Sequence, residues 1–181
     1  MKKLVIVNGT MGVGKSTIVS KLYKELQHSV WLDGDWCWLM NPWKVTEENK
    51  TMVMNNIHYM LNQYLDNSMF EYVFFSWVIH KESIFDEILA GLKGNEYELI
   101  KVTLMCSEEE LIKRMRQDER SESEIENSIN RLANYKEMNT QKLNTNGKEI
   151  DVIIKELLHM IDSELKKRAM KADNNIEKNS V

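Results

Sequence analysis

The stretch from Gly9 to Ser16 constrains the fold of this chain more than any other segment. It reads Gly-x-x-x-x-Gly-Lys-Ser, and it follows the short β-branched apolar run 3–7. Residues 17–27 come next, and their apolar positions recur at helical spacing. A strand, a glycine-rich loop and a helix in this order predict the first unit of an α/β fold.

This loop satisfies the P-loop pattern and carries groups suited to holding phosphates. Its glycines let the backbone approach a phosphate chain without Cβ clashes, and its N–H groups supply partial positive charge together with the helix N-terminus. Lys15 adds a full charge near the β- and γ-phosphates, and the Ser16 hydroxyl is a ligand for Mg²⁺. The alternative, a chance glycine-rich turn, is disfavoured by the strand and helix on either side. The predicted nucleotide-binding residues are Gly9, Thr10, Met11, Gly12, Val13, Gly14, Lys15, Ser16 and Thr17.

The rest of the chain alternates strand and helix patterns. The apolar run 72–79 is nearly continuous, as is typical of a central parallel strand buried on both faces. Further strands are predicted over 29–32, 98–105 and 141–145, and helices within 46–65, 84–92, 107–115, 123–138 and 150–165. This alternation predicts a three-layer α/β/α fold with a five-stranded parallel sheet. We expect one domain over residues 1–165 and a frayed, lysine- and asparagine-rich tail over 166–181.

Three of the predicted helices begin with capping signals. Thr46 is placed to cap the helix that follows it, and Ser107 with Glu110 has the spacing of a capping box. Ser123 with Glu126 repeats that spacing and predicts the start of another helix.

Composition excludes several classes of function. The chain has 181 residues and a net charge of −4, which argues against general nucleic-acid binding. Its two cysteines make neither a disulfide framework nor a metal set, so we expect a reducing compartment, the cytoplasm. The first apolar run is too short for a signal peptide, and no stretch approaches the roughly 20 apolar residues of a membrane span. A small-molecule partner is expected, and monomer and homodimer both stay open.

Asp33-Gly34-Asp35 follows the second predicted strand. In parallel α/β sheets ligands bind at the carboxyl ends of the strands, so both carboxylates are placed to face the P-loop. One carboxylate suits the activation of an acceptor hydroxyl and the other suits Mg²⁺. The alternative is an ordinary turn, since Asp-Gly is a common turn dipeptide.

Aromatic residues gather directly after this pair. Trp36, Trp38 and Trp43 either wall an acceptor pocket or pack into the core, and Trp36 and Trp38 share a side if the segment is extended. His80, just past the third strand, either faces the acceptor or is a polar residue at a strand end.

On these residues the sequence resembles the small bacterial P-loop kinases, which include shikimate, gluconate and adenylylsulfate kinases, chloramphenicol phosphotransferase-like enzymes and AAA-type nucleotide kinase-like ATPases. The resemblance rests on the P-loop, on Asp33-x-Asp35, on the arginine-rich patch 114–120 and on the loop 145–148. It covers residues 3–162 and implies a nucleoside/shikimate kinase-like fold that uses ATP and Mg²⁺.

The resemblance also implies roles for individual residues. Asp35 would activate the acceptor, with Lys15, Arg114 and Arg120 as further catalytic residues, and Asp33 would help Ser16 to hold Mg²⁺ through water. The further implied assignments are Arg116, Asn146, Gly147 and Lys148 at the nucleotide, a short lid over 114–124 and an acceptor-binding region over 36–65. The candidate acceptor-binding residues are Asp35, Trp36, Trp38, Trp43 and His80.

Several alternatives remain for the arginines. Arg114 is also placed to pair with Glu110 on a solvated helix face, since the two are four residues apart. Arg120 lies between two predicted helices, which favours a functional role. Arg131 is a further candidate for which a solvated helix face is the favoured interpretation. The third strand departs from the family pattern, because Ser76 and Trp77 stand where a metal-binding aspartate is expected.

These observations favour an ATP-dependent phosphotransferase that acts on a hydroxyl of a small molecule. The alternatives are a nucleoside monophosphate kinase, which is disfavoured because no arginine lies between Ser29 and Gly94, and a non-catalytic ATP-binding module, which the missing aspartate favours. A toxin-like kinase acting on a cell-wall sugar nucleotide is not separated from the first hypothesis.

Overall fold

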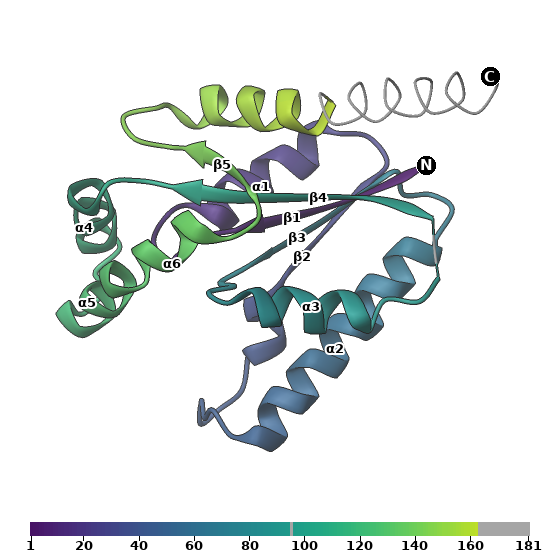
Figure 1. The fold of residues 1–181 in the computed structure, drawn as a ribbon, viewed down its shortest axis with the longest axis horizontal. Coiled ribbons are helices and arrows are strands. Elements are labelled where there is room, and N and C mark those ends of the chain that lie inside the picture. The colour runs from purple at the N-terminus through teal and green to yellow at the C-terminus, as the bar shows by residue number, and fades with distance from the viewer. Residues whose placement is uncertain (95, 163–181) are drawn as a thin grey trace, which may run out of the picture. The chain divides into compact units, whose positions relative to one another are not determined.

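The computed structural model describes residues 1–94 and 96–162, and it contains one parallel sheet of five strands (Figure 1). The strand order is β2-β3-β1-β4-β5. The strands are β1 (Lys2–Asn8), β2 (Ser29–Asp33), β3 (Tyr72–Trp77), β4 (Tyr97–Met105) and β5 (Gln141–Asn144). The predicted five-stranded parallel sheet is confirmed, and β3 ends two residues earlier than the apolar run suggested.

Strand β1 is the centre of the sheet because it pairs in parallel with β3 on one side and β4 on the other. Its residues Leu4, Val5, Ile6 and Val7 are fully buried, so both of its faces are covered. Apolar side chains on both faces of the central strand contribute roughly 1.5–3 kcal/mol each when they leave water.

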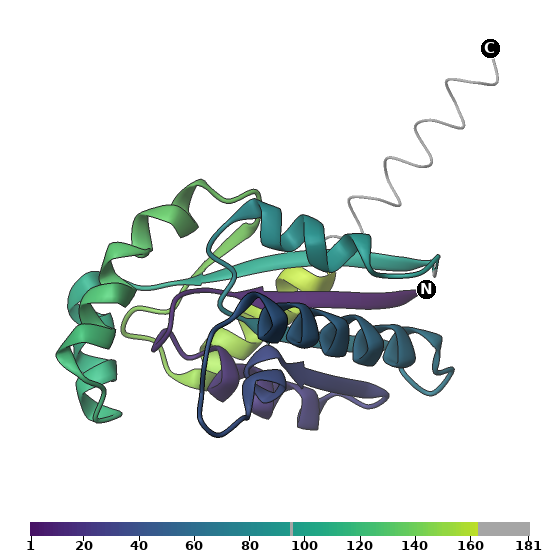
Figure 2. The same cartoon turned by 90° about the horizontal axis from the view of Figure 1, so that it is seen from below.

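Helices cover the two faces of the sheet and make the predicted three layers. Helix α1 (Lys15–Glu25) lies on one face, whereas α2 (Glu47–Asp66) and α3 (Glu82–Ala90) lie on the other (Figure 1). From below, α2 and α3 both run in front of the strands (Figure 2). Leu4 and Ile6 belong to the apolar cluster under α2 and α3. Because side chains alternate along a strand, the residues between them face α1.

The elements around the carboxyl ends of the strands are short. A 3₁₀ helix, η1 (Gly34–Trp38), follows β2 directly. Helices α4 (Glu108–Gln117), α5 (Glu122–Asn130) and α6 (Leu132–Glu137) follow β4 before the chain returns to the sheet as β5. In Figure 1, α4, α5 and α6 lie to the left of the strands.

Two of the three predicted helix caps are present in the structure. Thr46 caps α2, because its hydroxyl accepts a hydrogen bond from the Asn49 N–H at 3.1 Å. Ser107 caps α4, but only half of the predicted box forms, because the Glu110 carboxylate accepts a hydrogen bond from Arg114.

The predicted cap at Ser123 is wrong. Ser121 caps α5 instead, and it forms a complete capping box with Glu124. The sequence contains the same Ser-x-x-Glu spacing twice in succession, and the turn after α4 allows only the first copy to open the helix. The single helix predicted over 123–138 is divided into α5 and α6 at Arg131.

Contacts divide the chain into two compact units, 1–147 and 148–181. In the second unit residues 150–162 are helical, and its buried residues Ile153, Ile154, Leu157 and Ile161 recur at helical spacing. The predicted tail over 166–181 lies outside the described residues, so the single domain over 1–165 stays a prediction. Among the helices that the structure describes, none combines the length and apolar character of a membrane span.

Candidate functional site

The P-loop connects β1 to α1 with a backbone that only glycine adopts easily. Gly12 has φ +80°, and a Cβ atom there would lie 2.3 Å from the Met115 Cγ of α4. Gly14 has φ +100° and is the residue at which α1 begins. The glycines therefore serve two purposes: they shape the loop, and they let α4 approach it closely.

Lys15 is buried within the loop that it belongs to. Its side chain is 8% exposed, and Nζ donates a hydrogen bond to the Thr10 carbonyl at 3.0 Å. Burial lowers the pKa of Lys15 from 10.5 to about 8, although the charges of Asp35 and Asp33 partly offset the loss of hydration. A desolvated cation held at a glycine loop is suited to attract phosphate oxygens.

Asp33 connects the P-loop to the neighbouring strands. Its Oδ2 accepts hydrogen bonds from the Ser16 hydroxyl at 2.6 Å and from the Ser76 hydroxyl at 3.2 Å. Ser76 in turn accepts one from the Trp31 indole at 2.9 Å, and the Asp35 N–H donates to Asp33 Oδ1 at 3.1 Å. The carboxylate is 4% exposed and fully engaged by donors, as a buried charge requires.

The missing aspartate of β3 now has a physical explanation. Asp33 and Ser76 are register partners on the adjacent strands β2 and β3, so they lie at the same level of the sheet. The carboxylate reaches the P-loop from β2, and the serine that stands on β3 supports it with a hydrogen bond.

The residues present fit a magnesium ion bound together with nucleotide phosphates. Ser16 and Asp33 place a hydroxyl and a carboxylate oxygen next to each other, and both are hard donors of the kind that Mg²⁺ prefers. In residues 1–94 and 96–162 there is no group of three or more His, Cys, Asp or Glu side chains that would hold a metal without a ligand. Mg²⁺ usually needs only one or two protein ligands when phosphates and waters supply the rest.

Asp35 lies two residues after Asp33, in η1. Its pKa is raised because the carboxylate loses hydration and because the Asp33 charge lies nearby; Lys15, a hydrogen bond from Trp77 and the charge of Arg120 act in the opposite direction. A Cβ atom at the preceding glycine, Gly34, would lie 2.5 Å from the Trp77 ring, so this ring packs directly on the η1 backbone.

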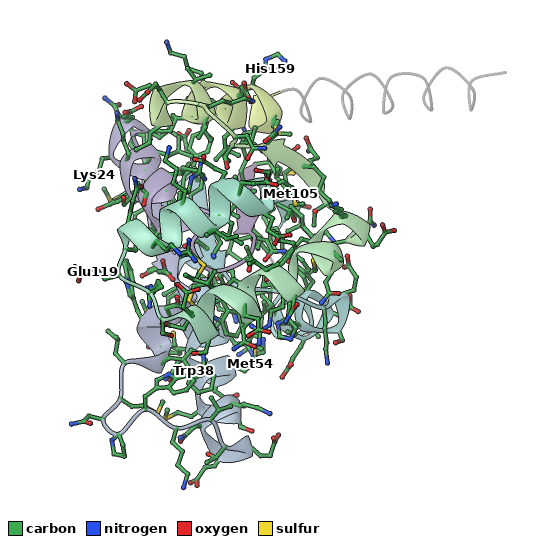
Figure 3. All side chains as sticks on the ribbon, turned by 90° about the vertical axis from the view of Figure 1, so that its left-hand side faces the viewer. Lys24, Trp38, Met54, Met105, Glu119 and His159 are labelled. Atoms are coloured by element: carbon green, nitrogen blue, oxygen red, sulfur yellow. The ribbon has the colours of Figure 1, made fainter. Side chains whose placement is uncertain are left out.

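The tryptophans do not share a side. The segment is a 3₁₀ helix rather than extended, so the condition for Trp36 and Trp38 to point the same way is not met. Trp36 packs on Trp31, with ring centroids 4.8 Å apart. Trp38 packs against Trp43, with centroids 6.3 Å apart, and against the apolar cluster that includes Met54 (Figure 3).

Arg114 donates hydrogen bonds to three other residues of the chain. Its Nε donates to Glu110 at 2.8 Å, and its Nη atoms donate to the carbonyl of Val13 and to the hydroxyl and carbonyl of Thr145 at 2.9–3.1 Å. The helix-face alternative accounts for one of these partners, Glu110, whereas the other two join the P-loop to the turn after β5.

The other arginines are less enclosed. Arg116 pairs with Glu122 on the surface, and Arg120 pairs with Glu124 at 3.2 Å. Arg120 is also close enough to Asp35 for its charge to lower the pKa of that carboxyl. Of the three arginines in the predicted lid, Arg120 is the one that the structure brings to the predicted acceptor side.

Asn146 and Gly147 form the turn after β5. The Asn146 side chain accepts a hydrogen bond from the Ser107 N–H at 2.7 Å, which ties this turn to the start of α4. Gly147 has φ +60° with open space around its Cα. Lys148 belongs to the second unit, where it forms an ion pair with Glu156 at 2.7 Å.

His80 lies beside a separate pocket. Burial lowers the pKa of His80, and the positive charges of Arg131 and Lys81 lower it further. The pocket has a volume of about 480 Å³, and its lining includes His80, Asn134 and Glu137. The structure therefore places Arg131 near His80, which the helix-face interpretation did not anticipate.

Sequence reasoning missed the contributions of Ser76 and Trp77. Both were noted only as replacements for an aspartate, yet Ser76 supports Asp33 and Trp77 donates to Asp35. The available signal was their position at the carboxyl end of a strand, where polar and aromatic side chains of neighbouring strands meet.

Comparisons with known proteins agree with this fold. A family model described as an AAA domain matches residues 5–141. A gluconokinase from Sinorhizobium meliloti 1021 superposes with a TM-score of 0.69 at 18% identity, covering 94% of this chain and 97% of its own. Among curated proteins, none matches the sequence.

Two further solved structures are similar. The tunicamycin resistance protein of Deinococcus radiodurans has a TM-score of 0.67 at 15% identity, with 89% of this chain and 96% of the other covered. Shikimate kinase from Acinetobacter baumannii has a TM-score of 0.62 at 19% identity, with 91% and 95% covered. At these identities the likeness establishes the P-loop kinase fold.

Proposed function

Because the chain belongs to the AAA-domain family and has the fold of the P-loop kinases, we propose that it is an ATP-dependent phosphotransferase acting on a hydroxyl of a small molecule. One observation carries the proposal: Asp35 and Lys15 are close enough for the charge of each to act on the pKa of the other, and the charge of Asp33 acts on both. A phosphate-binding cation thus faces a candidate base across a short distance.

Each of these residues has a distinct part in the proposed transfer. The acceptor O–H gives its proton to the Asp35 carboxylate while its oxygen attacks the γ-phosphorus of ATP, and the bond to the bridging oxygen breaks so that ADP leaves. The raised pKa of Asp35 makes it a better proton acceptor than an ordinary aspartate. Lys15 and Arg120 offset the charge that spreads over the transferring group.

The metal site follows from the same geometry. Ser16 and Asp33 would hold Mg²⁺, which when bound with ATP neutralises phosphate charge. Arg114 is assigned a positioning part here, because its donors are already directed at Glu110, Val13 and Thr145.

A second candidate is an ATP-binding module without phosphoryl transfer. The observation that favours it is the serine on β3 in place of an aspartate. Nucleotide binding is common to both candidates, so only an acceptor-dependent reaction separates them.

The experiment is a screen of small hydroxyl compounds for acceptor-stimulated ADP release, followed by Asp35→Ala. We expect kcat to fall by about 10²-fold or more, the usual contribution of a positioned base, while the Kd for ATP stays within about twofold. Asp86→Ala, which removes an exposed carboxylate from α3, is the matched control and should retain full activity. Steady ADP release that no acceptor stimulates would favour the second candidate.

A further inference from the structure

Large apolar side chains are exposed in one segment next to Asp35. Ten large hydrophobic residues in the described part of the chain are exposed, and five of them fall within 36–52. These five are Trp36, Leu39, Trp43, Val45 and Met52. Such a concentration over 17 residues is unusual for a soluble surface and indicates a binding function.

The 3₁₀ geometry of η1 places one tryptophan on the same side as the candidate base. A 3₁₀ helix has three residues per turn, so side chains three positions apart are eclipsed. Asp35 and Trp38 stand in this relation within η1 (Gly34–Trp38). Three-residue periodicity therefore places Asp35 and Trp38 on the same face of η1.

Trp38 and Trp43 together form what we call the tryptophan platform. Trp38 is half-buried against the apolar cluster beneath α2, which supports it from below. Trp43 packs on Trp38 with ring centroids 6.3 Å apart, and it is 66% exposed. The platform therefore begins next to Asp35, is fixed at its inner end and presents a ring to solvent at its outer end.

Charge around the platform does not favour an anionic ligand. Within 36–52 the two basic residues, Lys44 and Lys50, are matched by Glu47 and Glu48, and Lys50 already pairs with Glu47 at 2.7 Å. No arginine lies within 36–52, and Arg120, whose charge acts on Asp35, is already paired with Glu124 at 3.2 Å. A phosphate or carboxylate on the acceptor would find no bidentate partner in this segment.

We propose that the phosphoryl acceptor is an uncharged hydroxyl compound that carries a planar apolar ring, and that this ring stacks on the tryptophan platform while the hydroxyl lies at Asp35. Nucleosides and aryl glycosides belong to this class. The inference rests on the proposed phosphotransferase function and adds the substrate class to it.

Matched pairs of acceptors test this directly. We would compare phenyl β-D-glucoside with methyl β-D-glucoside, and uridine with ribose, and include uridine 3′-phosphate as the charged analogue that keeps the primary 5′-hydroxyl. In at least one pair, the member with the planar ring (phenyl glucoside or uridine) should show about 10-fold higher kcat/KM for ADP release. This factor is the order of one base–aromatic stacking contact. The charged analogue should be the poorer substrate.

A variant of the platform then assigns the preference to a residue. Trp43→Ser should remove most of the kcat/KM advantage that the acceptor with the planar ring has over its partner, and it should leave the Kd for ATP unchanged. Tyr59→Ser is the matched control, because Tyr59 is an exposed aromatic residue of similar exposure on α2, at 64%. Thermal unfolding of both variants would show that each is folded.

Each other outcome overturns the inference in an identifiable way. The substrate class is wrong, and the phosphotransferase function stands, if the simple sugars are the better acceptors. The same holds if Trp43→Ser does not change the kcat/KM of any acceptor. If Trp43→Ser converts a dimer into a monomer in sedimentation, the platform is an interface between copies of this chain. If no compound in this panel stimulates ADP release but another hydroxyl compound of the broader screen does, the substrate class is wrong and the phosphotransferase function stands. If no compound of either set does so although ATP binds, the proposed function itself fails.

Discussion

At the residue scale, the site depends on three neighbouring charges, of which Lys15 and Asp33 are buried and Asp35 is exposed. Lys15 is desolvated, which lowers its pKa, while Asp35 loses hydration beside Asp33, which raises its pKa. The Lys15 charge attracts both carboxylates, whereas the Asp33 charge disfavours the charged form of Asp35. Phosphates added to this set would favour the charged form of Lys15.

The lowered pKa of Lys15 predicts a pH dependence of nucleotide binding. Lys15 is charged below a pH of about 8 and loses its proton as the pH rises through that value, so the Kd for ATP should be flat near neutral pH and rise above pH about 8. Calorimetric titrations from pH 6.5 to 9.5 would measure this. Lys15→Met should bind weakly with no alkaline rise, and a wild-type Kd that stays constant to pH 9.5 would contradict the assignment.

The same shift affects the ligand-free protein. Between about 8 and 10.5 the unfolded chain, with an ordinary lysine, binds more protons than the folded chain. The free energy of unfolding therefore rises with pH in this window as far as Lys15 is concerned, because the cost of a buried cation is relieved.

Gly12 gives a second prediction at this scale. Gly12→Ala adds a Cβ atom 2.3 Å from the Met115 Cγ at a φ of +80°, so the Met115 side chain or α4 itself must shift. We expect a loss of about 1–3 kcal/mol in the free energy of unfolding, with weaker ATP binding. Denaturant unfolding and calorimetry measure the two effects.

Gly94→Ala is the matched control for this glycine. Gly94 also has a positive φ, +29°, but nothing lies within 4 Å of an added Cβ. It should cost less stability and leave ATP binding intact. Equal losses in both variants would mean that backbone strain, rather than the contact with α4, explains the effect.

At the scale of elements, Arg114 joins three segments that are distant in sequence. It extends from α4 to the carbonyl of Val13 in the P-loop and to Thr145 after β5. Thr145 is itself buried and bonds back to the Met105 carbonyl at the end of β4. The P-loop is thus braced against the turn after β5, at the edge of the sheet.

Removing this brace should weaken both stability and nucleotide binding. For Arg114→Ala we expect a loss of about 2 kcal/mol in the free energy of unfolding, because a charged donor to several acceptors is removed from a mostly enclosed site. The Kd for ATP should rise, since the Val13 carbonyl belongs to the P-loop. Lys113→Ala, at the exposed neighbouring position, is the control and should change neither quantity.

At the scale of the whole molecule, the parallel sheet brings the candidate site residues together. All five strands run in one direction. The P-loop after β1, Asp33 at the end of β2 and Trp77 at the end of β3 therefore lie together at the carboxyl ends of the strands. Residues far apart in sequence become neighbours without any long loop.

Because the nucleotide binds only the folded arrangement, it should stabilise the whole protein. At a free ATP concentration of about 100 Kd with Mg²⁺ present, linkage predicts a gain of about 2.7 kcal/mol, equivalent to a rise in Tm of about 5–10 °C. Differential scanning calorimetry measures this. Lys15→Met should show little rise, and the absence of a shift in the wild-type chain would exclude ATP as the ligand.

The sequence alone determined those features that depend on local pattern. Short stretches of consecutive residues specify the glycine loop, the apolar run of β3 and the Thr46 cap. The P-loop, the parallel sheet and the three layers could therefore be predicted. Local ambiguity caused the errors, as with Ser121 and Ser123, where one spacing occurs twice and only packing chooses between the copies.

Only the tertiary structure decided which distant residues meet. The partnership of Asp33 with Ser76 depends on strand register, the separation of Trp36 from Trp38 depends on a 3₁₀ turn, and the brace at Arg114 depends on the return of β5. These contacts join residues that are close in space but not in sequence, or they follow from a backbone conformation that packing imposes. A pattern of neighbouring residues carries no information about either.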